Sequence, residues 1–279
     1  MDISEENNRI KVPARIHILL AKTSAQALIL RRGPSRQTAV ISWNRRDDTF
    51  KVGQWLKGKI YHFRSDISPD GKHWIYFAMG KMGNTWTGVA KVPYFTASDF
   101  HIKGDSWNGG GLFLSDRKYW LNNNGVLLHE NRRKESALEV SNTYPGHESG
   151  YGECPMIYFI RLKRDGWKEE SMKALTRNET IQTFSKRINH HWTMIKIFHM
   201  GSRNVTGKGV YYEEHRLVNR QEELEIPLPD WEWADLDRDR LIWAEKGNIC
   251  TGVMKQEGLR NVKNLYCCNE LKFVNIAAP

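Results

Sequence analysis

The feature that most constrains this chain is a succession of short aromatic and β-branched runs, each closed by a turn signal. The runs at 38–43 and 74–79 show the pattern, and the second follows the turn sequence Ser-Pro-Asp-Gly at 68–71. Proline presets one turn angle, and glycine accepts the positive φ that tight hairpins require. Strands of this kind, spaced about 8–12 residues apart, are typical of β-sandwiches, barrels and propellers. The sequence therefore predicts an all-β fold.

Internal repeats narrow the choice among these architectures. Three stretches share an apolar entry, an acidic turn and an aromatic strand: 66–78, 112–121 and 233–245. Trp74 and Trp120 lie 46 residues apart, and so do Asp70 and Asp116. That recurrence matches the roughly 40–45 residues of one propeller blade. At about 45 residues per blade the chain allows about six blades, and an irregular stretch lowers the expectation to about five.

The irregular stretch covers residues 168–190. Its apolar residues recur at roughly helical spacing, whereas the threonine, serine and asparagine residues between 176 and 185 favour extended or irregular backbone. A helix therefore stays open as one alternative, and an irregular insertion or an extended edge as the other. We expect an irregular insertion here, and we expect no helix elsewhere.

The turn at 68–71 and the Trp-Ile-Tyr-Phe strand at 74–77 resemble the repeat of WD-type and TolB-like β-propellers. The segments 16–71 and 231–245 also resemble a family of uncharacterised bacterial proteins of similar length. The resemblance implies a radial β architecture and carries no activity with it. We therefore expect a single β-propeller domain over 1–279, with residues 1–10 as a flexible tail. A two-sheet β-sandwich is the alternative.

Charge and cysteine content bear on partners and compartment. Lysine and arginine number 42 against 32 acidic residues, which gives a net charge of +10. The basic stretches are short, so they indicate either a solvated surface or a face for an anionic partner. The four cysteines are too few for a disulfide framework, and the acidic N-terminus does not look like a secretion signal. We expect a cytoplasmic protein that does not enter membranes.

The glycine-rich stretch at 104–113 is the most unusual local composition. It lacks the Gly-Lys-Ser/Thr ending of a phosphate-binding loop. We expect a crossover between strands that needs positive φ or close backbone approach. The alternative is a surface loop in which Asp105 and Trp107 meet a ligand.

Residues for catalysis or metal binding do not gather in the sequence. Cys154 has only His147 nearby as a potential base, and the other histidines are scattered. No zinc motif is present, so we expect no metal, no cofactor and no catalytic residue. Trp231 and Trp233 alternate as on a strand, which predicts that both indoles share one face. That face would pack on the neighbouring blade or, alternatively, stack a base or sugar.

These observations favour a non-enzymatic binding or assembly module whose partner is a protein. The expected partner-binding residues are Arg31 and Arg32, which precede a Gly-Pro turn, and Trp107 in the glycine loop. One alternative is a basic protein that associates with nucleic acid. Another is a hydrolase in which two carboxylates, about 5–10 Å apart, converge at the ring centre.

Overall fold

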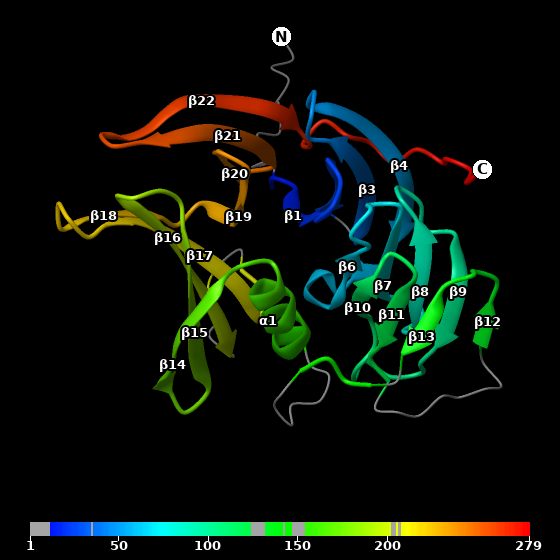
Figure 1. Ribbon diagram of the computed structural model, residues 1–279. Coiled ribbons are helices and arrows are strands. Elements are labelled where there is room, and N and C mark those ends of the chain that lie inside the picture. The colour runs from blue at the N-terminus through cyan, green and yellow to red at the C-terminus, as the bar shows by residue number, and fades with distance from the viewer. Residues whose placement is uncertain are drawn as a thin grey trace, which may run out of the picture.

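The computed structural model describes residues 12–34, 36–123, 132–141, 143–146, 154–201, 205 and 208–279. Within these residues the chain forms five β-sheets and one α-helix (Figure 1). The all-β prediction is confirmed, and five separate sheets are not the two stacked sheets of a sandwich. The expected tail at 1–10 lies outside the described residues.

The first half of the chain builds three sheets, here named A to C in chain order. Sheet A is a meander of β1 (Arg15–Leu20), β2 (Gln26–Arg32), β3 (Gln37–Asn44) and β4 (Thr49–Lys57). Sheet B contains β5 (Lys59–Ile60), β6 (Asp66–Ile67), β7 (His73–Met79), β8 (Thr85–Lys91), β9 (Ala97–Ile102) and β12 (Arg132–Lys134). Sheet C contains β10 (Gly111–Ser115), β11 (Lys118–Leu121) and β13 (Glu139–Ser141). A short 3-10 helix, η1 (His62–Arg64), follows β5.

The helix α1 (Cys154–Arg164) separates these sheets from the last two. Sheet D contains β14 (Lys168–Thr176), β15 (Glu179–Arg187), β16 (Trp192–Gly201), β17 (Tyr211–Asn219) and β18 (Leu224–Leu228). Sheet E contains β19 (Trp231–Asp237), β20 (Arg240–Glu245), β21 (Asn248–Lys255) and β22 (Gly258–Cys267).

Contacts between these elements follow a circular order. Strand β1 touches β6 of sheet B and β19 of sheet E, and β6 touches β10 of sheet C. Helix α1 touches β10 on one side and β14 on the other, and β17 touches β19. The sequence of neighbours is therefore A, B, C, α1, D, E and back to A, with β1 near the middle of Figure 1.

The three sequence repeats are equivalent hairpins. They form the antiparallel pairs β6–β7, β10–β11 and β19–β20, one in each of sheets B, C and E. The first two repeats touch directly, because the backbone amide of Asp70 donates to the carboxylate of Asp116 at 2.8 Å. The repeat that the sequence indicated is therefore a repeat of structure.

The prediction of an irregular insertion at 168–190 is wrong, because residues 168–187 pair as the antiparallel hairpin β14–β15. Strand β14 is exposed along its whole length, which matches the alternative of an extended edge. In β15 the side chain of Phe184 is fully buried. The polar residues between 176 and 185 therefore lie mostly on β15, which pairs with both β14 and β16, and they do not interrupt the sheet.

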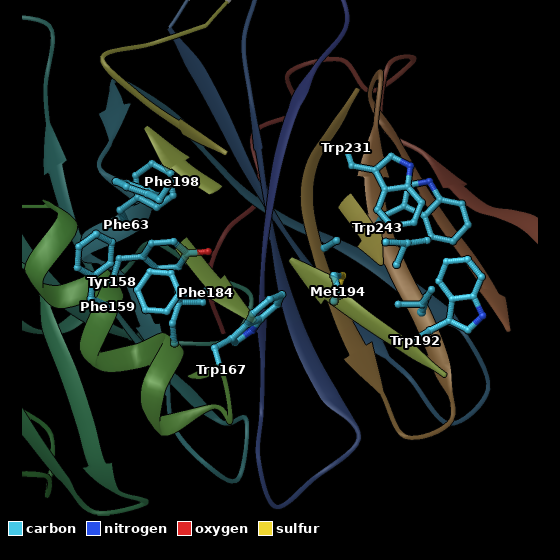
Figure 2. Packing of buried hydrophobic residues seen from close by; sticks show 14 of the residues in the cluster. Phe63, Tyr158, Phe159, Trp167, Phe184, Trp192, Met194, Phe198, Trp231 and Trp243 are labelled. Carbon is cyan, nitrogen blue, oxygen red and sulfur yellow. The ribbon is translucent and has the colours of Figure 1, made fainter. Parts of the chain in front are cut away.

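Helix α1 was not expected from the sequence. It buries Ile157, Tyr158, Phe159 and Leu162. Figure 2 shows Tyr158 and Phe159 among aromatic rings from other elements, including Phe63, Phe184 and Phe198. The helix thus fills the space between sheets C and D with apolar side chains.

Trp231 and Trp233 do not share a face, contrary to the prediction. A register shift between them interrupts the pairing of β19 with β20. Trp231 stacks on Trp243, with ring centroids 4.4 Å apart, in the cluster beside sheet D (Figure 2). Trp233 packs in a different cluster with sheet A. Such a bulge rotates the following side chains, and both indoles are core residues.

The glycine-rich stretch is a tight crossover between strands, which is the first of the two structures expected for it. Gly104, Gly109 and Gly110 have positive φ, and a Cβ at Gly110 would collide with the carbonyl oxygen of Arg64.

Gly110→Ala should therefore lower the free energy of unfolding by about 3 kcal/mol or more. Gly104→Ala, which has open space around it, should cost only about 1–2 kcal/mol. Urea denaturation measures both variants, and equal costs would contradict the packing described here.

Candidate functional site

A buried polar network joins α1 to sheets D and E. The Nζ of Lys196 on β16 donates to the Glu213 carboxylate on β17 at 3.0 Å, and both side chains are 1% exposed. The Tyr158 hydroxyl on α1 donates to the other oxygen of Glu213, and Lys196 also reaches the Ala234 carbonyl at 3.4 Å. Burial lowers the pKa of Lys196, although Glu213 opposes that effect.

The arginines of α1 extend the network to the first three sheets. Arg161 donates to the Ser65 carbonyl and, at 2.6 Å, to the Nε2 of His17 on β1. Since a guanidinium has no acceptor, His17 accepts through Nε2 and is neutral. Arg164 forms two hydrogen bonds to Asp66 on β6, at 2.6 and 2.9 Å. Helix α1 therefore holds the sheets together through charge as well as through its apolar face.

Two cavities flank this network, and each of their carboxylates has a cationic partner. The smaller cavity, of about 150 Å³, is lined by acidic, basic and apolar side chains of β1, β6, α1 and β19. The ion pairs of the two cavities are Asp66 and Asp165 with Arg164, Asp235 with Lys186, Glu213 with Lys196, and Glu232 with Arg15. Each of these carboxylates therefore has a cation beside it, although burial still raises the pKa values of Asp165 and Glu232.

The larger cavity has a volume of about 750 Å³ and lies at the start of β1. Its floor comes from β1, the end of β2 and β19, and its walls come from the β5–η1 segment, the β7–β8 turn and the start of β17. We call it the Arg32 cavity. Its charged and aromatic lining residues are Arg15, His17, Arg32, Arg36, Lys59, Tyr61, His62, Phe63, Arg64, Lys81, Lys208, Tyr211, Tyr212, Glu213 and Glu232.

The described lining of the Arg32 cavity is strongly positive. Seven side chains are lysine or arginine and two are glutamate, which leaves an excess of five positive charges. Both glutamates are already engaged, because Glu232 accepts from Arg15 at 2.6 Å and Glu213 accepts from Lys196. The wall therefore presents positive charge that its own carboxylates do not balance.

Arg32 is the most exceptional of these cations. Its Nε is buried and makes no hydrogen bond, and the described residues offer the guanidinium no ion pair. Burial lowers the pKa of Arg32 to about 10, although Glu232 opposes that effect. Taking a charged donor out of water without a partner costs free energy, and the half-buried Arg32 bears that cost at its Nε.

Two histidines in the cavity have pKa values that burial and nearby arginines lower. Burial and then Arg161 hold the pKa of His17 well below its ordinary value. Burial and then Arg32 do the same for the pKa of His62. Both imidazoles are therefore neutral at pH 7 and do not add to the positive charge.

Buried neutral histidines make stability depend on pH. The pKa of His215, near Lys196, is also held well below its ordinary value by burial. Unfolding lets His17, His62 and His215 take up protons below about pH 6.5, and each then removes up to about 1.4 kcal/mol of stability per pH unit. We therefore expect the free energy of unfolding to fall as the pH drops from 7 to 5.5.

Chemical denaturation at several pH values tests this expectation. His17→Gln, whose amide oxygen can still accept from Arg161, should remove about a third of the pH dependence, since the pKa values of His62 and His215 are also held low. His190→Gln, at an exposed position, should leave the pH dependence unchanged. Comparing the two variants separates the contribution of the histidines to the pH dependence from that of Glu232 and Asp165, whose pKa values burial raises. A stability that does not change between pH 7 and 5.5 would contradict the account.

The structure separates the three residues expected to bind a partner. Arg32 lines the cavity, whereas Arg31 is 3% exposed and donates to the carbonyls of Cys268, Gly33 and Leu271. The donors of Arg31 are occupied within the chain, contrary to the exposed anchor that the sequence suggested. Trp107 is 67% exposed on the glycine loop, and its contact with a partner stays a prediction.

Other candidates from the sequence do not form a centre. Cys154 is buried and its Sγ accepts from the Arg64 Nε at 3.0 Å, while His147 lies outside the described residues. Across the described part of the chain, no three His, Cys, Asp or Glu side chains gather as metal ligands. Within the same residues, no helix is long and apolar enough to cross a membrane.

Most of the residues that line the Arg32 cavity were not predicted from the sequence. Lys59 begins the two-residue strand β5 and Tyr61 directly follows that strand, and the Lys59 Nζ lies 4.4 Å from the centroid of the Tyr61 ring. Lys208 lies 5.4 Å from the Tyr212 ring. Each basic residue is paired with an aromatic one nearby in sequence, and that pairing is the signal that could have indicated them.

Comparisons with known proteins do not identify the chain. No family model matches it, and no curated protein matches it. Solved structures that align with it include an uncharacterised protein of Listeria monocytogenes, with 8% identity and a TM-score of 0.32, over 91% of this chain and 67% of that one. The AtxE2 isopeptidase aligns with 11% identity and a TM-score of 0.38, over 91% of this chain and 52% of its own.

The β-propeller domain of the Trilobed protease from Pyrococcus furiosus aligns with 9% identity and a TM-score of 0.32, over 90% of this chain and 84% of that domain. This chain spans about half the length of the isopeptidase. At these scores the likenesses carry no conclusion about fold or activity, and the function has to be argued from the site itself.

Proposed function

We propose that this chain is a non-enzymatic binding module, folded as a single five-bladed β-propeller, that captures an anionic ligand in the Arg32 cavity. The circular order of the five sheets supports the propeller, with α1 between the third and fourth blades. The observation that carries the binding proposal is the half-buried side chain of Arg32, whose Nε is buried without a hydrogen bond and whose guanidinium has no ion pair among the described residues.

The ionisation of the described cavity residues favours binding over catalysis. Both glutamates are held in ion pairs, and the lowered pKa of His62 makes its imidazole a weak base. The cavity wall instead presents a set of positive charges on a rigid propeller, at the start of β1. Such a wall is suited to holding an anion in place.

Thermal unfolding with three anions tests the proposal: sodium tripolyphosphate, citrate and a hexaglutamate peptide. A ligand at about 100 times its Kd should stabilise the folded state by about 2.7 kcal/mol and raise the unfolding midpoint accordingly. Arg32→Gln should abolish the increase. The control Lys263→Gln, which removes one exposed charge outside the cavity, should keep it. If no anion raises the midpoint of the unaltered protein, the proposal is wrong.

A further inference from the structure

We infer that the ligand of the Arg32 cavity is a phosphate ester of nucleotide size. Its phosphates bind Arg32, and its apolar part lies against Tyr61 and Tyr211. This inference rests on the proposed function and specifies its ligand. It depends on three properties of the cavity, namely its charge excess, the chemistry of Arg32 and its aromatic lining.

The charge excess favours a multiply charged ligand. The described lining carries five more positive than negative charges, and both of its glutamates are engaged in ion pairs. One carboxylate would balance a single charge, whereas a phosphate monoester carries about −1.5 to −2 at pH 7. A chain of two or three phosphates therefore matches the wall better than a single acidic side chain does.

The guanidinium of Arg32 has the geometry for a phosphate. It is planar, and its donors form a fork that can bind two oxygens of one phosphate. Its Nε is buried and lacks a hydrogen bond, so a ligand oxygen would satisfy a donor that the described residues leave unsatisfied. Arg15 lies on the floor beside it, where its own charge lowers the pKa of Arg32 after the larger effect of burial. Adjacent cations of this kind stabilise a dense negative charge.

The remaining volume and the aromatic side chains indicate a second, flatter part of the ligand. A cavity of about 750 Å³ falls within the range of about 300–1,000 Å³ found for small-molecule sites. Tyr61 and Tyr211 are partly buried against the core cluster and also line the cavity, and they come from different sheets. Aromatic side chains next to cations stack bases and bind the attached phosphates. A nucleoside polyphosphate has both parts.

Isothermal titration calorimetry with metal-free adenosine triphosphate, tripolyphosphate, citrate and hexaglutamate tests the inference. We expect both phosphates to bind, with adenosine triphosphate at least tenfold tighter. Tyr211→Leu should remove the tenfold advantage and leave tripolyphosphate binding unchanged, because leucine keeps the apolar contact with the core. Arg32→Gln should weaken both phosphates at least tenfold, and Lys263→Gln should weaken neither. Thermal unfolding of each variant without ligand confirms that it is folded.

The alternative outcomes separate the two proposals. Citrate or hexaglutamate binding more tightly than both phosphates would overturn the inference and leave the proposed function intact. Equal affinity for tripolyphosphate and adenosine triphosphate would overturn the nucleotide-sized ligand. A single-stranded oligonucleotide that binds more tightly than adenosine triphosphate would overturn it in favour of nucleic acid. If none of these anions binds, both the inference and the proposed function are wrong.

Discussion

Arg32→Met is expected to make the ligand-free protein more stable and to weaken tripolyphosphate binding by about 10- to 100-fold. The loss of affinity follows from hydrogen bonds to a charged group, which contribute about 1.5–3 kcal/mol. The gain in stability follows because methionine removes a buried donor that has no hydrogen bond. Even a buried ion pair can be replaced by apolar residues of similar volume at no cost or with a gain of up to about 4 kcal/mol, and Arg32 lacks an ion pair among the described residues.

The opposite signs of the two effects make Arg32 diagnostic. Replacing a residue that merely supports the fold would lower the stability of the protein, and binding would weaken as a consequence. Lys263→Met is the matched control, since it removes the same charge from an exposed position on β22 and should change neither property. Urea denaturation and calorimetry measure the two effects independently. A destabilised Arg32→Met, or one that still binds tripolyphosphate normally, would contradict the account.

Glu213→Leu is expected to lower the free energy of unfolding by about 3–5 kcal/mol. The replacement leaves the ammonium group of Lys196, which is 1% exposed, without its carboxylate. Breaking a buried ion pair from one side costs that much because the remaining charge stays out of water. Tyr158 on α1 loses its acceptor as well, so the contact between the helix and sheet D weakens.

The double variant separates the charge effect from lost packing. Adding Lys196→Met to Glu213→Leu should recover most of the lost stability, since no unpaired ion then remains. The exposed pair Arg216–Glu225, also on sheet D, is the control, and Arg216→Met should cost less than about 1 kcal/mol. Urea denaturation of the unaltered protein, Glu213→Leu, Lys196→Met and the double variant gives the coupling free energy. A double variant as unstable as Glu213→Leu would contradict the role given to this ion pair.

Much of the strand pattern could be predicted because local rules decide it. Aromatic and β-branched runs between turn residues became β2, β3, β4, β7 and β8. The recurrence of 46 residues found two equivalent hairpins, and the amide of Asp70 bound to the carboxylate of Asp116 shows that they are neighbours. Periodicity of side chains and turn chemistry act over a few residues, so the sequence carries them directly.

Neither the helix nor the hairpin that follows it was predicted as it stands. Apolar spacing left a helix open as an alternative at 168–190, yet the helix lies at 154–164. Its signals are Pro155 near the start, Arg161 and Arg164 in the last turn, and Gly166 with a positive φ after the end. The β14–β15 pair is set by contacts with β16, which no local pattern reveals.

The candidate site could be predicted only in part. The sequence pointed to Arg31 and Arg32 together, but neighbouring residues of a strand face opposite sides. Which of the two faces the cavity depends on how sheet A packs against its neighbouring sheets, and that is a property of the whole fold. Lys59, Lys81 and Lys208 come from three distant segments, so their convergence is also decided by tertiary structure.

The pKa of His62, followed by nuclear magnetic resonance with and without tripolyphosphate, tests the central claim most directly. Burial, and after it the positive charge of Arg32, lowers the pKa of His62, so in the free protein its imidazole should stay neutral well below pH 6.5. A bound anion would cancel the charge of Arg32, and the pKa of His62 should then rise. A His62 that titrates normally in the free protein, or a pKa that saturating tripolyphosphate leaves unmoved, would contradict an anion site built around Arg32.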